Sequence, residues 1–399
     1  MKEKGFDSSR VPCIRVITFY LFILLLFTAS ALSGCIEEYE ADISTEDSDL
    51  LVVEGTICSH EMNTFVLSRT QAISSFGITQ MVQGARLSVL GSDGSEYHAY
   101  PGYGFYSCWV DSLSPDVDYY LHIETDGEVY ETEPQKPLPT ESIAEVIGVQ
   151  NTPESNIDVL VTPEEPFEDN QTKYYSWTYD ETWQVYPEYT NNNVYFDLNL
   201  MKPVFKTNMF PEYGWKDDIG TTINVGASIN YEGQHIRRLK IYDIDRSDER
   251  VYHRYSGLIH QRAISKAEYE YELARRQAGS EMGGLFTPQP SALPTNIHCL
   301  TSKKHVIGYV GCSLNRAERR FFLNAKDFSI YHPRHDALIW FDDTSMNDCI
   351  IMVNRGLYLC VWQDERPWGK LKTGWAYEYQ LDVRLQGAYI EEPYFWSLE

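Results

Sequence analysis

The chain has 399 residues, of which 58 are acidic and 33 are lysine or arginine, so its net charge at pH 7 is −25. Phosphate backbones and anionic lipids carry the same sign and repel such a chain, which excludes nucleic acid as a partner. The length exceeds the usual size of a single hydrophobic core, and this predicts more than one domain.

Residues 1–34 have the layout of a signal peptide. Basic residues occur within the first fifteen positions, and an almost unbroken apolar segment follows from Val16 to Leu32. That segment is short for a membrane helix, which needs roughly 20 apolar residues, although a plain membrane helix is the alternative. The sequence Leu-Ser-Gly-Cys at its end resembles a bacterial lipobox. We therefore expect Cys35 to be lipidated, to become the mature amino terminus and to hold the protein on the outer membrane through acyl chains such as palmitate.

Residues 35–49 form an acidic tether in this interpretation. Glu37, Glu38 and Asp42 resemble the acidic export signal of surface lipoproteins in Bacteroidota. The plainer interpretation is a solvated linker, because the segment has little apolar surface to bury. The first interpretation predicts a surface-exposed protein, and the second is neutral on this point.

Residues 50–136 are predicted to form a β-sandwich of the immunoglobulin-like or transthyretin-like kind. Short segments rich in β-branched and aromatic residues alternate with turn signals. Asp93-Gly94 and Asp126-Gly127 each lie between two such segments and predict tight hairpins. Tyr119, Leu121 and Ile123 alternate with polar neighbours and should face the core.

Three prolines between positions 134 and 139 mark a domain boundary, because proline cannot join a central ladder. Residues 141–399 are again rich in strand-forming residues and predict a second β-rich, sandwich-like domain. A single helix is expected at 265–278, where Ser265 and Glu268 have the spacing of a capping box. The Gly- and Pro-rich stretch 280–297 that follows should be a long ordered loop.

Six cysteines remain once Cys35 is lipidated and the signal is removed, namely Cys58, Cys108, Cys299, Cys312, Cys349 and Cys360. An even number in an exported chain permits disulfides, and we expect at least one bridge among the last four. Zinc is the competing interpretation, but the sequence has no Cys-x-x-Cys pair.

The sequence contains only weak matches to metal-binding and catalytic motifs. His332, His335 and Asp336 could supply metal ligands, but Pro333 disfavours a helix there, and surface histidines are the plainer interpretation. The acids of residues 243–248 resemble the start of a calcium loop without its glycine. No nucleophile elbow occurs, so neither a catalytic residue nor a cofactor is assigned.

Several motifs occur in an order and spacing that resemble one family. They are "LLVVEGTI", "GARLSVLGSDG", "YYSWTYDETW", "ISKAEYEYELARRQAGSEMGGLFTPQPSALPTNI" and "VIGYVGCS", with Phe395 and Trp396 near the end. This order is similar to domain of unknown function 4249, a family of outer-membrane lipoproteins in Bacteroidota. Members often carry two closely spaced cysteines near the end, whereas Cys349 and Cys360 lie further apart.

The resemblance implies an outer-membrane location and, commonly, a gene neighbourhood with TonB-dependent transporters, without an established activity. We expect a non-enzymatic binding or accessory component of nutrient uptake, and a surface hydrolase or an adhesin is the alternative. Leu285 and Phe286 in the loop are the predicted docking residues, and covering the second domain's core is the loop's other potential role.

Overall fold

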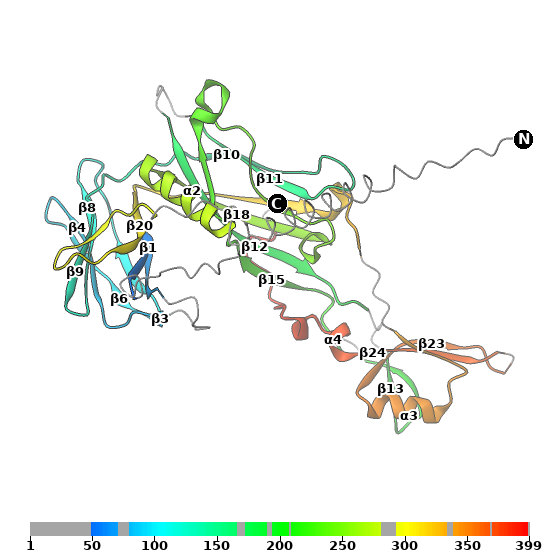
Figure 1. The fold of residues 1–399 in the computed structure, drawn as a ribbon. Coiled ribbons are helices and arrows are strands. Elements are labelled where there is room, and N and C mark those ends of the chain that lie inside the picture. The colour runs from blue at the N-terminus through cyan, green and yellow to red at the C-terminus, as the bar shows by residue number, and fades with distance from the viewer. Residues whose placement is uncertain are drawn as a thin grey trace, which may run out of the picture. The chain divides into compact units, whose positions relative to one another are not determined.

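The computed structural model divides into two units, Met1–Ser48 and Asp49–Glu399. It describes residues 49–70, 80–165, 172–189, 194–206, 209–280, 293–332, 338–367 and 369–397, all within the second unit. Strands dominate and helices are few, which confirms the predicted mainly-β fold (Figure 1). Within these described ranges, no helix is both long and apolar enough to cross a membrane.

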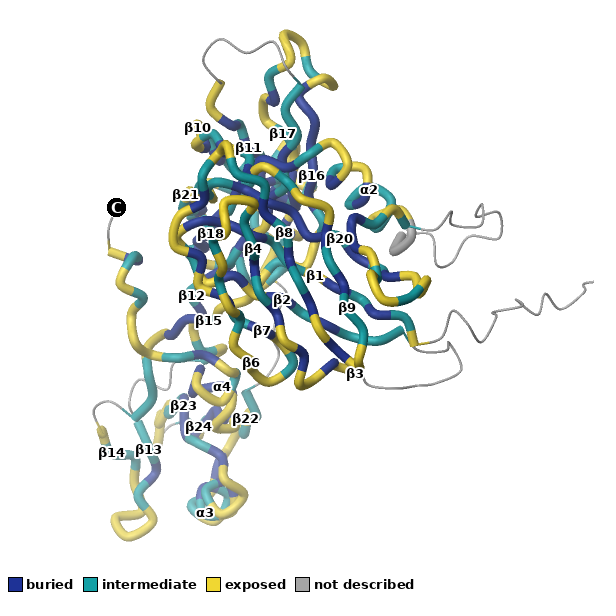
Figure 2. Tube along the Cα trace, turned by 90° about the vertical axis from the view of Figure 1, so that its left-hand side faces the viewer, coloured by how far each residue is buried: buried dark blue, intermediate teal, exposed yellow. Residues whose placement is uncertain are grey.

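The first sandwich consists of two sheets that enclose one hydrophobic core, with buried segments along the strands of both (Figure 2). One sheet has the order β20-β1-β2-β7-β6, with β3 also paired to β2, and the other has the order β19-β9-β8-β4-β5. The strands are β1 (Leu51–Cys58), β2 (Glu61–Arg69), β3 (Gln80–Met81), β4 (Arg86–Gly91), β5 (Glu96–His98), β6 (Tyr100–Pro101), β7 (Tyr106–Val110), β8 (Tyr119–Thr125), β9 (Glu128–Thr132), β19 (Ile297–Cys299) and β20 (Val306–Ser313).

The predicted hairpins lie in this sandwich. Asp93-Gly94 connects β4 to β5, and Asp126-Gly127 connects β8 to β9. Asp126 and Gly127 both have positive φ, 53° and 78°, as the tight turn requires. Tyr119, Leu121 and Ile123 on β8 are buried, so the predicted alternation is confirmed.

Two strands of this sandwich come from far along the chain. β20 pairs in parallel with the whole of β1, from Leu51 opposite Val306 to Cys58 opposite Ser313, and β19 pairs with β9. Gly308 permits this close pairing, because a Cβ atom there would lie 1.9 Å from the Val53 carbonyl oxygen. The region predicted as the first domain therefore shares its sheets with strands beyond residue 290, which the sequence did not suggest.

The second sandwich pairs a sheet of order β10-β11-β17 with a sheet of order β15-β12-β18-β21, in which β16 also pairs with β12. Side chains from both sheets form one core that includes Trp177, Tyr255 and Ile259. The strands are β10 (Ile143–Val149), β11 (Ile157–Pro163), β12 (Tyr174–Val185), β15 (Gly214–Ile219), β16 (Asn224–Ala227), β17 (Leu239–Ile244), β18 (Arg254–Ile264) and β21 (Ala317–Asn324).

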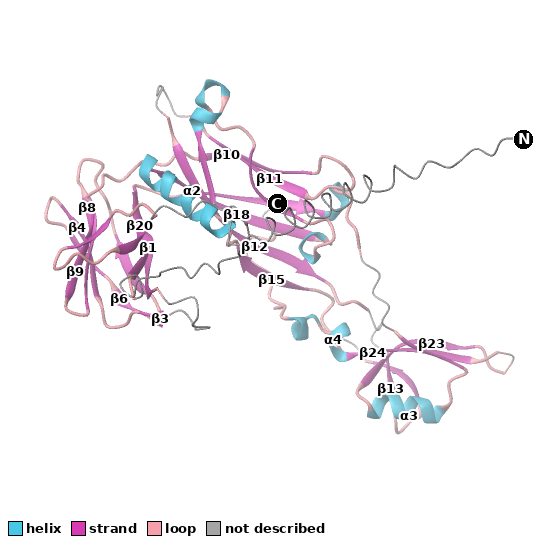
Figure 3. Cartoon of the chain, in the orientation of Figure 1, coloured by secondary structure: helices cyan, strands magenta, loops and turns pink. Residues whose placement is uncertain are grey.

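Seven further elements form a small α/β lobe with its own apolar clusters (Figure 3). They are β13 (Val194–Asp197), β14 (Lys202–Phe205), β22 (Ile339–Asp342), α3 (Met346–Asn354), β23 (Leu357–Asp364), β24 (Leu371–Tyr377) and α4 (Glu378–Leu381). Neither α3 nor α4 was predicted from the sequence. α3 begins with a capping box between Ser345 and Asp348, a signal that the sequence does contain.

The predicted helix is α2 (Lys266–Ser280), which begins and ends within two residues of the expected 265–278. The Ser265 hydroxyl accepts a hydrogen bond from the Glu268 backbone N–H at 3.1 Å, as a helix cap should. Instead of completing the capping box, the Glu268 carboxylate pairs with Arg262 on β18. Arg262 and Glu268 both line the candidate site.

Candidate functional site

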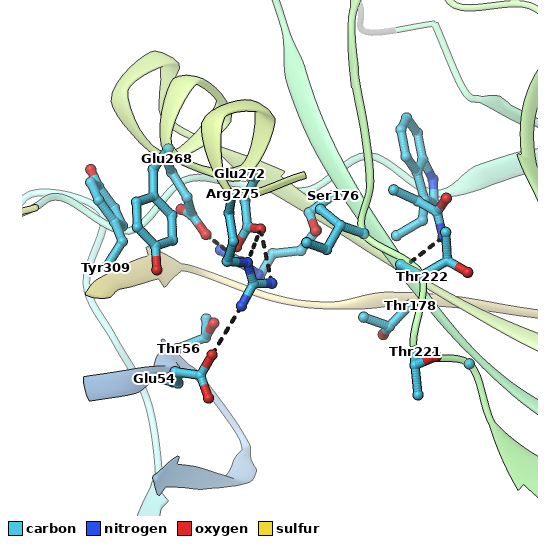
Figure 4. A pocket seen from close by; sticks show the side chains of 17 residues that line it. Glu54, Thr56, Ser176, Thr178, Thr221, Thr222, Glu268, Glu272, Arg275 and Tyr309 are labelled. Carbon is cyan, nitrogen blue, oxygen red and sulfur yellow. Dashed lines mark hydrogen bonds and ion pairs between the residues drawn. The ribbon is translucent and has the colours of Figure 1, made fainter. Parts of the chain in front are cut away.

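A polar pocket of about 340 Å³ lies where α2 meets β1, β20 and the β12–β18 sheet (Figure 4). Its volume falls within the range of small-molecule sites. Glu54 and Thr56 come from β1, Ser176 and Thr178 from β12, and Tyr309 from β20. The remaining wall is formed by α2, Arg262 and the segment 220–224.

The floor of the pocket contains a buried ion pair between Arg262 and Glu268. Their side chains are only 14% and 5% exposed, and Arg262 also donates to the Ser313 hydroxyl at 3.4 Å. Burial alone would lower the pKa of Arg262, but the negative charge and hydrogen bond of Glu268 outweigh the effect of burial. The pKa of Arg262 is therefore raised. Gly311 makes room for this pair, since a Cβ atom there would lie 2.3 Å from the Glu268 carboxylate.

A second cluster of charges bridges α2 and β1. The Arg275 guanidinium donates to the Glu272 carboxylate through Nε at 3.0 Å, and to Glu54 on β1 through Nη1, also at 3.0 Å. Burial raises the pKa of Glu272, and the nearby Arg275 only partly opposes that shift. The arginine is half-exposed, so this bridge lies at the solvent side of the site.

Aromatic rings and hydroxyl groups complete the lining. The rings of Tyr271 and Tyr309 lie 5.6 Å apart, and burial raises the pKa of Tyr271 to about 12, so its phenol is neutral at pH 7. In the part of the chain that the structure describes, no protein group hydrogen bonds to the hydroxyls of four lining residues. These are Thr56, Ser176, Thr178 and Thr221.

This arrangement suits binding of a polar solute. The guanidinium groups and the three carboxylates satisfy one another in ion pairs, whereas the hydroxyl groups remain available to donate and accept hydrogen bonds. Thr56 and Ser176 are half-buried, whereas Thr178 and Thr221 are exposed. A bound molecule would replace the water at these hydroxyl groups and bury the hydrogen bonds that it forms with them. The two tyrosine rings add an apolar surface beside the hydroxyls, as is common in small-molecule sites.

This pocket was not predicted from the sequence. Glu54 and Arg275 are 221 residues apart, and no local pattern links them. One signal was present, because Glu268, Glu272 and Arg275 have i, i+4 and i+7 spacing and must share a helix face with Tyr271 nearby. A charged face on a helix that also carries buried residues indicates a polar contact inside the protein.

None of the predicted site residues that the structure describes lines this pocket. Cys35, Leu285, Phe286, His335 and Asp336 are outside the described residues. The His332 ring lies 4.6 Å from that of Tyr252. Across the described ranges, no cluster of three or more His, Cys, Asp or Glu side chains could hold a metal ion.

The acids of the calcium-like stretch have partners within the chain. Asp243 forms an ion pair with Lys240, Asp245 accepts from Ser247, and Asp248 forms an ion pair with Arg250. Their carboxylates thus stabilise this turn of the protein.

The predicted disulfide bridge is absent, because all six described cysteines are free. Cys349 and Cys360 lie in different apolar clusters. Cys58 and Cys312 are on paired strands, but Cys312 lies opposite Ile57. Neighbouring positions of a strand point to opposite faces, so these two thiols point apart. Cys299 is partly exposed and has hydroxyl partners of its own.

These features define a mainly-β protein in which two sandwiches and a helix enclose a polar pocket. The family model for the domain of unknown function DUF4249 matches residues 36–319, and the chain belongs to this family. The match includes every residue of the pocket lining. A comparison with curated proteins finds no match.

Proposed function

We propose that the protein is a lipid-anchored outer-membrane binding component, displayed at the cell surface, that assists a TonB-dependent transporter without catalysing a reaction. The observation that carries this proposal is the pocket, in which ion pairs fix the walls and free hydroxyls face the space between them. The accessory role is what the resemblance described in the sequence analysis implies, and the lipobox at Cys35 supports the anchor.

The charge of the chain limits the class of solute that the pocket can bind. Both guanidinium groups of the lining already pair with carboxylates, and the chain has a net charge of −25. An anion would gain no free cationic partner and would be repelled over longer distances. A neutral, hydrogen-bonding solute fits the open hydroxyls best.

The first experiment tests partner and anchor together. The wild-type protein, tagged at Glu399, is purified in mild detergent and analysed by mass spectrometry. We expect an acylated amino terminus at Cys35, a co-purifying TonB-dependent transporter and a bound small solute. A mature chain without lipid would contradict the anchor, and a lipidated monomer without an outer-membrane partner would direct attention to the hydrolase or adhesin alternatives.

The second experiment tests the pocket. Thr56→Val and Ser176→Ala remove hydroxyls with little change in volume, and should weaken binding of the co-purified solute about tenfold each, as loss of a buried hydrogen bond implies. Thr64→Val is the matched control, because Thr64 is an exposed threonine on the neighbouring strand outside the pocket. Equal affinity in all three variants would place the solute elsewhere.

A further inference from the structure

The first sandwich exposes an unusual number of large apolar side chains on one sheet. They are Met62, Met81, Tyr100, Tyr103, Phe105 and Trp109, with exposures of 56, 40, 72, 94, 40 and 51%. We call this set the aromatic face. Exposed segments beside β3, β6 and β7 are visible in Figure 2. Contiguous apolar patches on a soluble surface mark interaction sites.

Strand pairing places these residues together. Met62 on β2 lies directly opposite Trp109 on β7, and β6, which carries Tyr100, pairs with β7 on its other side. At the turn after β6, a Cβ atom on Gly104 would contact the Met81 side chain at 3.5 Å. β3 and this turn therefore meet, and the face is continuous across β2, β7, β6 and β3.

The aromatic face is also free of charge. No charged residue occurs in 62–68, 80–85 or 99–110, although 23% of the chain is charged. None of the side chains of the aromatic face carries a charge, so burying them avoids the largest cost of burying a protein surface. The rest of the acidic chain could remain in water.

The face lies beside the point where the amino-terminal segment leaves the sandwich. The Thr70 hydroxyl accepts a hydrogen bond from Leu50 N–H, and Arg69 lies opposite Gln80 across the strand pair of β2 and β3. Leu51 and Gln80 both lie opposite Arg69, on either side of β2, and are thus about two strand spacings apart, roughly 10 Å. Residues 35–48 span at most about 50 Å when fully extended, so an anchored Cys35 keeps the face within reach of the bilayer.

We propose that the aromatic face docks on the lipid bilayer to which Cys35 is anchored. This inference rests on the proposed lipid anchor. Tyrosine and tryptophan prefer the interface, where the ring enters the acyl region and the polar atom remains hydrated. The tether gives the face a high effective concentration at the membrane, so weak individual contacts suffice. Docking would fix the orientation of the first sandwich, and with it the β1 side of the pocket.

The test uses the lipidated full-length protein in phosphatidylcholine vesicles, with hydrogen exchange measured by mass spectrometry. Exchange in 100–106 should slow about threefold or more relative to the unlipidated Cys35→Ser protein, because bilayer contact excludes water from these amides. The β8–β9 hairpin, 119–132, is in the opposite sheet and should not change.

A fluorescence measurement tests the same contact with a conservative substitution. Vesicles with brominated acyl chains should quench the lipidated protein, and Trp109→Phe should remove most of that quenching while the protein stays bound. Trp340→Phe is the matched control, because Trp340 is similarly exposed at 47% but lies on β22, in the small lobe.

The outcomes separate the two proposals. Protein that does not bind vesicles contradicts the lipid anchor. Bound protein without slower exchange in 100–106 and without quenching overturns the aromatic-face proposal alone. Protection that depends on protein concentration assigns the face to a second copy, and protection that requires an added transporter assigns it to that protein; either result overturns docking on lipid.

Discussion

The Arg262–Glu268 pair offers a quantitative test of how α2 is held against the sheets. Glu268→Gln keeps the shape of the side chain but leaves a buried guanidinium without its counter-charge. Removing one partner of a buried pair costs about 3–5 kcal/mol. Since the amide oxygen can still accept a hydrogen bond, we expect the free energy of unfolding to fall by about 3 kcal/mol, the lower end of that range.

The same helix provides the control. Glu270 pairs with Lys266 at 3.5 Å, but both side chains are more than half exposed, so Glu270→Gln should cost less than about 0.5 kcal/mol. Urea unfolding followed by far-UV circular dichroism measures both variants, and Arg262→Met/Glu268→Leu should recover most of the loss because no lone charge remains. Equal losses in the two single variants would refute a buried, uncompensated charge as the cause.

Three further predictions follow from the same region and the cysteines. Ser265→Ala should lower the free energy of unfolding by about 1 kcal/mol by removing the α2 cap, and no change in urea unfolding would show that the cap is dispensable. Burial raises the pKa of Glu272 in the folded protein above its usual value of 4.5. Between the usual and the raised pKa, the folded protein therefore binds more protons than the unfolded chain. The contribution of Glu272 to the free energy of unfolding falls as the pH rises through this interval. Glu272→Gln should remove that part of the pH dependence, and identical pH profiles would contradict it. Under native conditions iodoacetamide should modify Cys299 first, because it is partly exposed and its hydroxyl partners outweigh burial and lower its pKa. By contrast, burial raises the pKa of Cys312 and Cys360 to about 12; mass spectrometry that finds a native disulfide, or equal labelling of all thiols, would refute this.

Features encoded within a few residues could be predicted from the sequence. The Asp126-Gly127 turn and the Ser265 cap depend on neighbouring residues only, and both occur where expected. α3 was missed although Ser345 and Asp348 have capping spacing, because the short apolar run after them is equally compatible with a strand. The pocket could not be predicted, since Glu54 and Arg275 meet only once β1, β20 and α2 have assembled.

The parallel pairing of β1 with β20 has a consequence for the order in which the protein can mature. A chain that crosses a membrane from its amino terminus delivers β1 long before β20, and until residue 313 arrives one edge of β1 stays unpaired. The free backbone N–H and C=O groups of such an edge can pair with strands of other chains. If the chain is exported as proposed, translocation of β1 and folding of the first sandwich would be separated by more than half the length of the polypeptide. A holding chaperone would protect the unpaired edge during that interval. A truncation before Ile297 would make the exposure permanent and should yield aggregates.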